Sequence, residues 1–149
     1  MTTSVAIRLR NHPSELAKVR DELDRLGRGY PIPERDLIEL QIALDEIVSN
    51  VIKYSWSDDI DHEFLVRISL HSDAITLQVI DDGPPFDPRR APAPTRRSKA
   101  DQVSRPGGLG IHLITNLVDG FDYQRIRGHN QTTLTKKVAT AAVQGKDRS

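Results

Sequence analysis

Two polar side chains that suit phosphate chemistry, Glu46 and Asn50, lie four residues apart in the apolar stretch from Leu40 to Tyr54. Residues with this spacing are neighbours on one face of a helix. A carboxylate can act as a general base, and an amide oxygen is a ligand that Mg²⁺ accepts. The residues beside them are Asp45, Ser49 and Lys53. Taken alone, the stretch also fits an ordinary solvated helix face.

The spacing of apolar residues predicts a long helix around Glu46 and Asn50. Pro33 suits the first turn of this helix, because its missing N–H is not needed there. The polar run from Ser55 to Asp61 favours a turn and ends the pattern. The residues that recur at intervals of three and four are Leu37, Leu40, Leu44, Ile47, Val48, Val51 and Ile52. This stripe is typical of a helix with one buried side.

Further elements are predicted on both sides of this helix. Alternating residues indicate strands at Ser4–Arg10, Phe64–His71, Ala74–Asp82, Phe121–Arg127 and Thr132–Val138. The second and third strands, joined at Ser72 and Asp73, predict an antiparallel hairpin, and a turn is expected at Gly128–Gln131. A helix is expected from Ser14, a suitable cap, to Gly27, a suitable stop, and another at Leu109–Leu117. The predicted fold is α+β, a two-layer sandwich whose mixed, mainly antiparallel sheet is covered by three helices.

A proline-rich, basic loop and a glycine cluster separate the third strand from the third helix. The loop runs from Gly83 to Pro106 and carries six prolines and six cationic side chains. A loop of this length in a small domain is either a functional lid or a flexible insertion. Gly107, Gly108 and Gly110 then lead into the helix. A glycine-rich helix start exposes N–H groups that favour phosphate.

Composition bounds the class of protein. A chain of 149 residues fits one domain, which we expect at 1–139 with a lid at 84–106 and a flexible tail at 140–149. Lysine plus arginine and aspartate plus glutamate both total 21, and there is no cysteine. No apolar run reaches membrane-spanning length, and no signal peptide is evident. A cytoplasmic protein that does not bind a membrane is therefore expected. Direct nucleic-acid binding is not expected either, because the basic residues cluster without interleaved aromatic side chains.

The three chemical patches gain meaning from their order. They are LDEIVSN on the central helix, DDGPPFDP after a strand, and GGLGIHL at a helix start. In this order and spacing the chain resembles the Bergerat-fold, histidine-kinase-like (GHKL) ATPase domains. It is most similar to anti-sigma factor serine/threonine kinases of the RsbW and SpoIIAB type, from the first strand to Val138.

The resemblance implies a role for each matching residue, with ATP and Mg²⁺ as cofactors. Glu46 corresponds to the general base and Asn50 to the Mg²⁺ ligand, while Asp81 matches the carboxylate that accepts the adenine amino group. The other residues assigned to the nucleotide are Lys53, Gly83, Arg105, Gly108, Leu109, Gly110 and Thr132. Asp82 is then expected to be exposed. Tyr54 and Gln131 depart from the family pattern, in which histidine and glycine are common at these positions.

The implied function is regulation of transcription by partner switching. A protein of this type sequesters a sigma factor, phosphorylates a STAS-type antagonist and forms a homodimer. The alternative is a non-catalytic, ATP-binding module that sequesters its partner. A histidine-kinase catalytic domain acting in trans is a third hypothesis, which the absence of an upstream phosphoacceptor helix pair disfavours. Tyr54 and Trp56 are expected at the edge of the core, and the five scattered histidines are not expected to bind metal.

Overall fold

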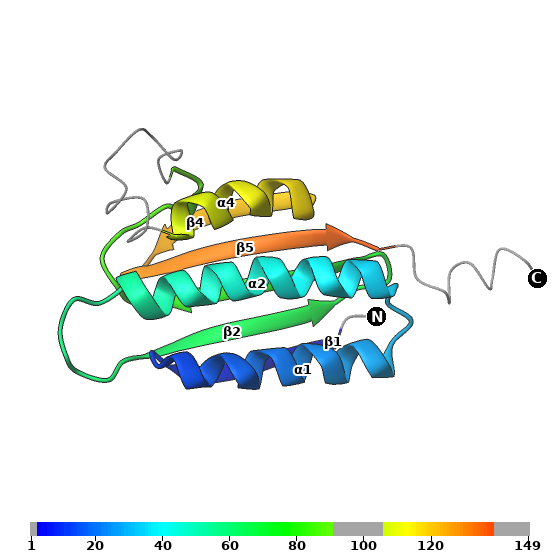
Figure 1. Ribbon diagram of the computed structural model, residues 1–149, viewed down its shortest axis with the longest axis horizontal. Coiled ribbons are helices and arrows are strands. Elements are labelled where there is room, and N and C mark those ends of the chain that lie inside the picture. The colour runs from blue at the N-terminus through cyan, green and yellow to red at the C-terminus, as the bar shows by residue number, and fades with distance from the viewer. Residues whose placement is uncertain (1–2, 91–105, 139–149) are drawn as a thin grey trace, which may run out of the picture.

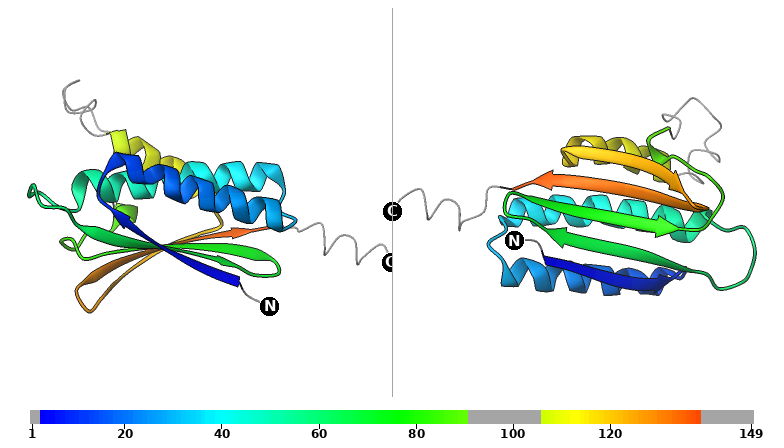
Figure 2. Two further views of the ribbon diagram at one scale, coloured as in Figure 1. Left: turned by 90° about the horizontal axis from the view of Figure 1, so that it is seen from below. Right: turned by 180° about the vertical axis from the view of Figure 1, so that it is seen from behind.

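One antiparallel sheet and a layer of helices make up the fold. The computed structural model describes residues 3–90 and 106–138. In these residues the strands are β1 (Thr3–Arg10), β2 (Glu63–Leu70), β3 (Ala74–Asp81), β4 (Gly120–Ile126) and β5 (His129–Lys137). The helices are α1 (Leu16–Gly29), α2 (Glu34–Tyr54) and α4 (Pro106–Leu117), with short 3₁₀ turns η1 (Pro13–Glu15) and η2 (Pro88–Arg90). The helices cover one face of the sheet (Figures 1 and 2).

The strand order is β1-β2-β3-β5-β4. Every pair of neighbouring strands is antiparallel, so none of the parallel pairing that a mixed sheet allows occurs among the described strands. The predicted hairpin between β2 and β3 is confirmed. The α+β class and the two-layer arrangement are confirmed as well.

Helix α2 lies across the middle of the sheet, with α1 and α4 on its two sides (Figure 1). Its apolar stripe points to the sheet, and Leu40, Leu44 and Val48 are buried there against strand residues such as Val66 and Leu77. The predicted end before Ser55 is confirmed, whereas Pro33 is the N-cap that precedes the first turn instead of a part of it. Burial of this stripe stabilises the layer packing and fixes which face of α2 remains outside.

Helix α1 starts and ends later than the sequence predicts. Ser14 lies within η1 and makes no side-chain cap, and the Glu15 carboxylate instead accepts a hydrogen bond from the Arg10 N–H at 2.8 Å. The helix continues past Gly27 to Gly29. A Cβ on Gly27 would lie 2.6 Å from Cδ2 of Leu37. Gly27 is therefore a contact point between α1 and α2, rather than a helix stop.

The turn between β4 and β5 is shorter than predicted. Only Arg127 and Gly128 form it, with φ angles of 50° and 80°. Positive φ at both central residues is typical of a two-residue hairpin turn, and glycine makes it easy. Strand β5 therefore begins at His129, three residues before the predicted start at Thr132. This shift brings Asn130 into the sheet, opposite Asp81 of β3.

Helix α4 begins at Pro106, before the predicted start at Leu109. Proline is favourable in the first turn of a helix, and its presence explains the earlier start. The glycines thus lie inside the first turns of α4 instead of preceding it. No helix in 3–90 or 106–138 is both long enough and apolar enough to cross a lipid bilayer.

Candidate functional site

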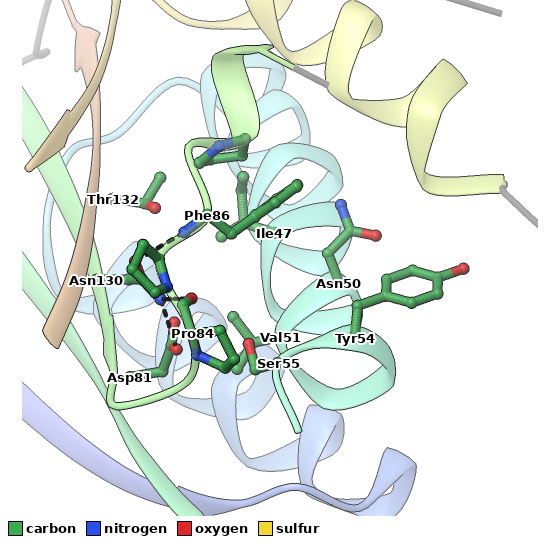
Figure 3. Close-up of a pocket in the computed structure, with 12 residues that line it drawn as sticks. Ile47, Asn50, Val51, Tyr54, Ser55, Asp81, Pro84, Phe86, Asn130 and Thr132 are labelled. Carbon is green, nitrogen blue, oxygen red and sulfur yellow. Dashed lines mark hydrogen bonds between the residues drawn. The ribbon is translucent and has the colours of Figure 1, made fainter. Parts of the chain in front are cut away.

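A pocket of about 220 Å³ lies where the end of α2 meets the end of β3 and the start of β5. Figure 3 shows Asp81 and Asn130 on one side of it and the α2 side chains Asn50 and Tyr54 on the other. The full lining is Ile47, Asn50, Val51, Tyr54, Ser55, Asp81, Pro84, Pro85, Phe86, Pro88, Asn130 and Thr132. This volume is below the roughly 300–1,000 Å³ of pockets that enclose a drug-sized ligand, so it suits one part of a larger ligand, such as a planar base.

Asp81 is the buried acid of the pocket, with 6% of its surface exposed. Its Oδ1 accepts hydrogen bonds from the Gly83 N–H at 2.9 Å and from Nδ2 of Asn130 at 3.1 Å. Among the described residues these bonds use Oδ1 alone, which leaves Oδ2 as an acceptor for a ligand. The neighbouring Asp82 is exposed, as predicted, and accepts a hydrogen bond from Nε1 of Trp56.

Gly83 allows two chain segments to meet at the pocket. A Cβ at this position would lie 2.6 Å from the backbone oxygen of Ser55, which follows α2. Such a contact with backbone cannot be relieved by a side-chain rotation. The resemblance implies that Gly83 lets the backbone approach a base, which stays a prediction. The structure shows that Gly83 brings the backbone close to the residue that follows α2.

Glu46 and Asn50 lie one turn apart on α2, as predicted. Asn50 lines the pocket, whereas Glu46 lies one turn further toward the start of the helix and does not. Burial raises the pKa of the partly buried Glu46 carboxyl; Lys53 opposes this shift and Asp45 adds to it. A carboxylate with a raised pKa is a stronger proton acceptor.

Asp45 has a separate role. Its carboxylate forms a two-pronged ion pair with Arg20 of α1, with distances of 2.8–3.1 Å. It therefore ties α2 to α1, on the side of α2 away from α4. The carboxylate next in sequence to Glu46 serves the packing of helices instead of the pocket.

The first turns of α4 lie beside the part of α2 that carries Glu46 and Asn50. Nζ of Lys136 contacts both Oε1 of Glu39 at 2.9 Å and the Leu117 carbonyl at 2.7 Å, which joins the end of α4 to the early part of α2. The two helices run in opposite directions (Figure 1). On α4, eleven residues separate Leu117 from Pro106, and on α2 eleven residues separate Glu39 from Asn50. At 1.5 Å per residue both spans are about 16 Å long, so the start of α4 lies at the level of Asn50.

The predicted phosphate residues Gly108, Leu109 and Gly110 therefore reach the level of Asn50 through the backbone of α4. Arg105, the predicted lid cation, lies outside the described residues. Two other cations of the same loop are already engaged, since Arg89 and Arg90 both pair with Asp87. The Arg89 hydrogen bond is the main cause that lowers the pKa of the Asp87 carboxyl.

The resemblance assigns Thr132 to the nucleotide, and sequence reasoning missed its neighbour Asn130. Both are buried and both line the pocket. Residues 130, 132 and 134 alternate along one face of β5, so a strand started two residues earlier would have pointed to Asn130. Phe86 was also missed; it is 53% exposed and extends from the loop toward α2 (Figure 3).

The two aromatic residues after Asn50 separate in the structure. Trp56 packs against the core, as predicted, and stacks on His62 with a centroid distance of 4.6 Å. Tyr54 is 53% exposed and lines the pocket, so its predicted place at the core edge is wrong. The reason is its position on α2, one turn after Asn50 on the outer side of the helix.

Metal ligands from protein alone are sparse. In 3–90 and 106–138 there is no group of three or more histidine, cysteine, aspartate or glutamate residues that could hold a metal ion. Mg²⁺ is commonly bound by one or two protein ligands together with substrate phosphates and waters. Asn50, which lines the pocket and carries an amide oxygen, fits that kind of site.

The model of the family described as "Histidine kinase-like ATPase domain" matches residues 9–136. The chain belongs to this family. The histidine kinase-like ATPase match runs from the end of β1 to β5. It therefore includes α2, β3 and the start of β5, which form the pocket. It confirms the family that the three sequence patches indicate.

Individual relatives of this ATPase domain are protein kinases by name. The serine/threonine-protein kinase BtrW of Bordetella bronchiseptica is 28% identical over 67% of this chain and 70% of its own length. The serine-protein kinase RsbW of Listeria innocua is 30% identical over 64% of this chain. RsbW of Bacillus velezensis is 28% identical over 86% of this chain and 84% of its own. The chain spans only 60% of the Listeria protein.

A solved structure shares the fold of this ATPase domain. It contains the RsbU and RsbW domains of a Mycobacterium tuberculosis protein and superposes with a TM-score of 0.65 at 19% identity. The match covers 91% of this chain and 32% of the other. At this identity the likeness shows the shared fold.

Proposed function

We propose that this chain is an ATP-dependent serine/threonine protein kinase that also acts as an anti-sigma factor. One observation carries the proposal: α2 presents Glu46 and Asn50 on one face, beside a pocket whose far wall holds the buried carboxylate of Asp81. Base recognition and phosphate chemistry then share one helix. The kinase names of the relatives support the same reaction.

In this proposal the pocket holds the adenine base. The free Oδ2 of Asp81 accepts a hydrogen bond from the amino group of adenine, and Thr132 lies on the same wall. A buried carboxylate used as an acceptor favours adenine over bases that present a carbonyl at that position, because two acceptors facing each other repel. The triphosphate then extends along α2 toward Asn50, Lys53 and the first turns of α4, including Gly108, Leu109 and Gly110.

The phosphate end of the site supplies charge stabilisation. Bound Mg²⁺-ATP provides the phosphoryl group and the metal that neutralises its charge, with the Asn50 oxygen as protein ligand. The N–H groups at the start of α4 donate to phosphate oxygens. Arg105 is the proposed cation from the lid, a role that Arg89 and Arg90 fill less well because both already pair with Asp87.

Glu46 is the proposed general base. Its carboxylate takes the proton from a serine or threonine hydroxyl of the partner protein as that oxygen bonds to the γ-phosphorus. The bond to the bridging oxygen breaks, and ADP leaves with its electron pair. The raised pKa brings Glu46 nearer to the working pH, where proton acceptance is most effective.

The proposed partners are a sigma factor and a STAS-type antagonist, which this chain binds in turn as a cytoplasmic homodimer. In that cycle the unmodified antagonist competes with the sigma factor for this chain. Phosphorylation of the antagonist by the kinase reaction then releases it. The alternative is an ATP-binding module that sequesters its partner without transferring phosphate. Tyr54 favours this alternative, because it lines the pocket and departs from the histidine of the family pattern that the sequence resembles.

A labelling assay separates the two functions. Purified chain, Mg²⁺ and ATP labelled at the γ-phosphate are incubated with each STAS-domain protein of the source organism. We expect label on a serine or threonine, and a loss of about 100-fold or more in rate for Glu46→Gln, with ATP affinity retained. In the wild type the rate should fall as the pH falls through the raised pKa of Glu46, because protonation removes the base.

The matched control is Asp45→Asn, which removes the adjacent carboxylate that pairs with Arg20. It should transfer phosphate at close to the wild-type rate. ATP binding without label on any STAS protein would favour the non-catalytic alternative. Undiminished transfer by Glu46→Gln would show that Glu46 is not the base.

A further inference from the structure

Asn130 is the most densely bonded side chain at the pocket wall. It is 4% exposed and lies opposite Asp81 in the β3-β5 ladder. Its Nδ2 donates to Oδ1 of Asp81 at 3.1 Å and to the carbonyl of Pro84 at 2.9 Å, with a longer contact of 3.4 Å to the Gly83 carbonyl. Its Oδ1 accepts from the Phe86 N–H at 3.1 Å and from the Tyr123 hydroxyl.

The partners of Asn130 allow only one orientation of its amide. The Pro84 carbonyl and an ionised Asp81 can only accept, so they require the NH₂ group. The Phe86 N–H can only donate, so it requires the amide oxygen. A turn of the amide by 180° would set donor against donor and acceptor against acceptor. Every bond therefore supports the others, and the side chain is held rigidly.

This arrangement determines which oxygen of Asp81 faces the pocket. Oδ1 is occupied by the Gly83 N–H and by Asn130, so the carboxylate cannot rotate without breaking both bonds. Oδ2 is then the acceptor presented to a ligand. The amide of Asn130 carries no charge, so it fixes the Asp81 carboxylate without placing a positive charge beside it.

The same side chain fixes the loop residues that line the pocket after β3. It bonds the backbone at Pro84 and Phe86, and Nη1 of Arg125 holds the Gly83 carbonyl at 2.7 Å. Figure 3 shows the bonds from Asn130 to Asp81 and to this loop. One residue of β5 thus couples the base-reading carboxylate to the loop that carries Phe86.

We propose that Asn130 is a positioning residue that sets the base selectivity of the pocket, by holding Asp81 with Oδ2 toward the 6-amino group of adenine. The inference rests on the proposed binding of ATP and names the residue that makes the pocket selective for it. Asn130 acts through Asp81 and the loop, and needs no contact with the nucleotide.

The test compares two nucleotides with the same triphosphate. Dissociation constants are measured for ATP and for purine riboside triphosphate, which lacks the 6-amino group. For the wild type we expect a preference for ATP of about tenfold or more, the usual effect of a hydrogen bond to a charged group. In Asn130→Ala the preference should fall to about twofold or less, because Asp81 can then rotate away.

Asn130→Asp gives a readout that a purely structural role would not produce. The new carboxylate repels Asp81 when both are ionised, and one shared proton restores the bond between them. The preference for ATP should therefore be weaker at higher pH, where both carboxylates are ionised, than at lower pH, where they share a proton. The wild type, which has no such pair of carboxylates, is measured beside the variant at each pH. The protonation of the triphosphate itself cancels in the ratio of the two nucleotides.

Thr133→Val is the matched control, because Thr133 lies near Asn130 on β5 but its side chain bonds Gln78 instead of Asp81. It should keep the wild-type preference. Folded Asn130 variants that retain the preference for ATP would overturn this inference but leave the proposed function standing. If Asn130→Ala does not fold, the Asn130→Asp variant decides, and a preference that does not change with pH would overturn the inference. A wild type that binds neither nucleotide would overturn the proposed function as well.

Discussion

Gly83 illustrates at the residue scale how a site can depend on a missing side chain. The chain after β3 passes so close to the end of α2 that a Cβ would lie 2.6 Å from the Ser55 carbonyl oxygen and 3.0 Å from Oδ1 of Asp81. The N–H of the same residue donates to that Oδ1. Gly83 therefore serves both the closure of the pocket and the orientation of its acid.

Gly83→Ala should accordingly separate α2 from the loop. We expect a loss of about 1–3 kcal/mol in the free energy of unfolding, the usual cost of forcing extra atoms into a packed site. ATP affinity should fall with it, because the Asp81 bond to the N–H is strained. Urea denaturation and nucleotide titration measure the two effects.

Gly29→Ala is the control for this substitution. Gly29 ends α1, and a Cβ there would have no heavy atom within 4 Å. Alanine should leave stability unchanged or raise it by up to about 1 kcal/mol through helix propensity. Equal stability losses in both variants would contradict the close contact at Gly83.

Local patterns and the family resemblance single out Asn50, Asp81 and Thr132, and the structure brings these three residues together around one pocket. Their roles toward a nucleotide stay predictions. Asn130 was not predictable from its motif, because its role depends on the register that places it opposite Asp81. That register follows from a two-residue turn at Arg127 and Gly128, which the sequence alone did not distinguish from a longer one.

At the scale of elements, Lys136 bonds the end of α4. Nζ of Lys136 on β5 donates to the last carbonyl of α4, Leu117, and to Glu39 of α2. The side chains of Lys136 and Glu39 are only 12% and 20% exposed, so the ion pair is well shielded from solvent. A cation at a helix end also interacts favourably with the helix dipole.

Removing this cation should loosen α4 from α2. Lys136→Met keeps the aliphatic stem but leaves Glu39 and the Leu117 carbonyl without their donor. We expect a loss of about 1.5–3 kcal/mol in the free energy of unfolding, the range for hydrogen bonds to charged groups. Because α4 carries the glycines that lie at the level of Asn50 and are proposed to bind phosphate, ATP affinity should decline too.

Lys137→Met is the neighbouring control, since Lys137 is exposed and it is its backbone N–H, which the substitution keeps, that bonds Asp119. It should change stability by less than about 0.5 kcal/mol in chemical denaturation. If the Lys136 and Lys137 variants were equally stable, the lysine anchor of α4 would contribute nothing measurable.

Elements were predicted more reliably than their boundaries. The apolar stripe of α2 and the alternation in β2 and β3 identify buried faces directly. Boundaries moved where tertiary contacts or neighbouring residues override a local signal. Gly27 packs on Leu37 instead of ending α1, and Pro106 starts α4 before the glycines.

For the whole molecule, the order of elements and the three patches together predict both the fold and the family. The apolar patterns define the strands and helices, and the fold brings the end of α2, the end of β3 and the start of β5 together at one pocket (Figures 1 and 3). The pocket itself is less predictable, because the prolines and Phe86 that close it acquire their positions from bonds to Asn130 and Arg125.

The measurement that tests the central claim most directly is a calorimetric titration of the chain with ATP, with and without Mg²⁺, repeated for Asp81→Asn. In this variant the oxygen that replaces Oδ1 must still accept from Gly83 and Asn130, so the new NH₂ group faces the adenine amino group, donor against donor. Asp82→Asn is the control, because Asp82 is exposed and bonds Trp56.

We expect the wild type and Asp82→Asn to bind ATP, more tightly with Mg²⁺, and Asp81→Asn to bind at least about tenfold more weakly. A folded wild type that binds no adenine nucleotide, or an Asp81→Asn variant that binds ATP as tightly as the wild type, would contradict the account.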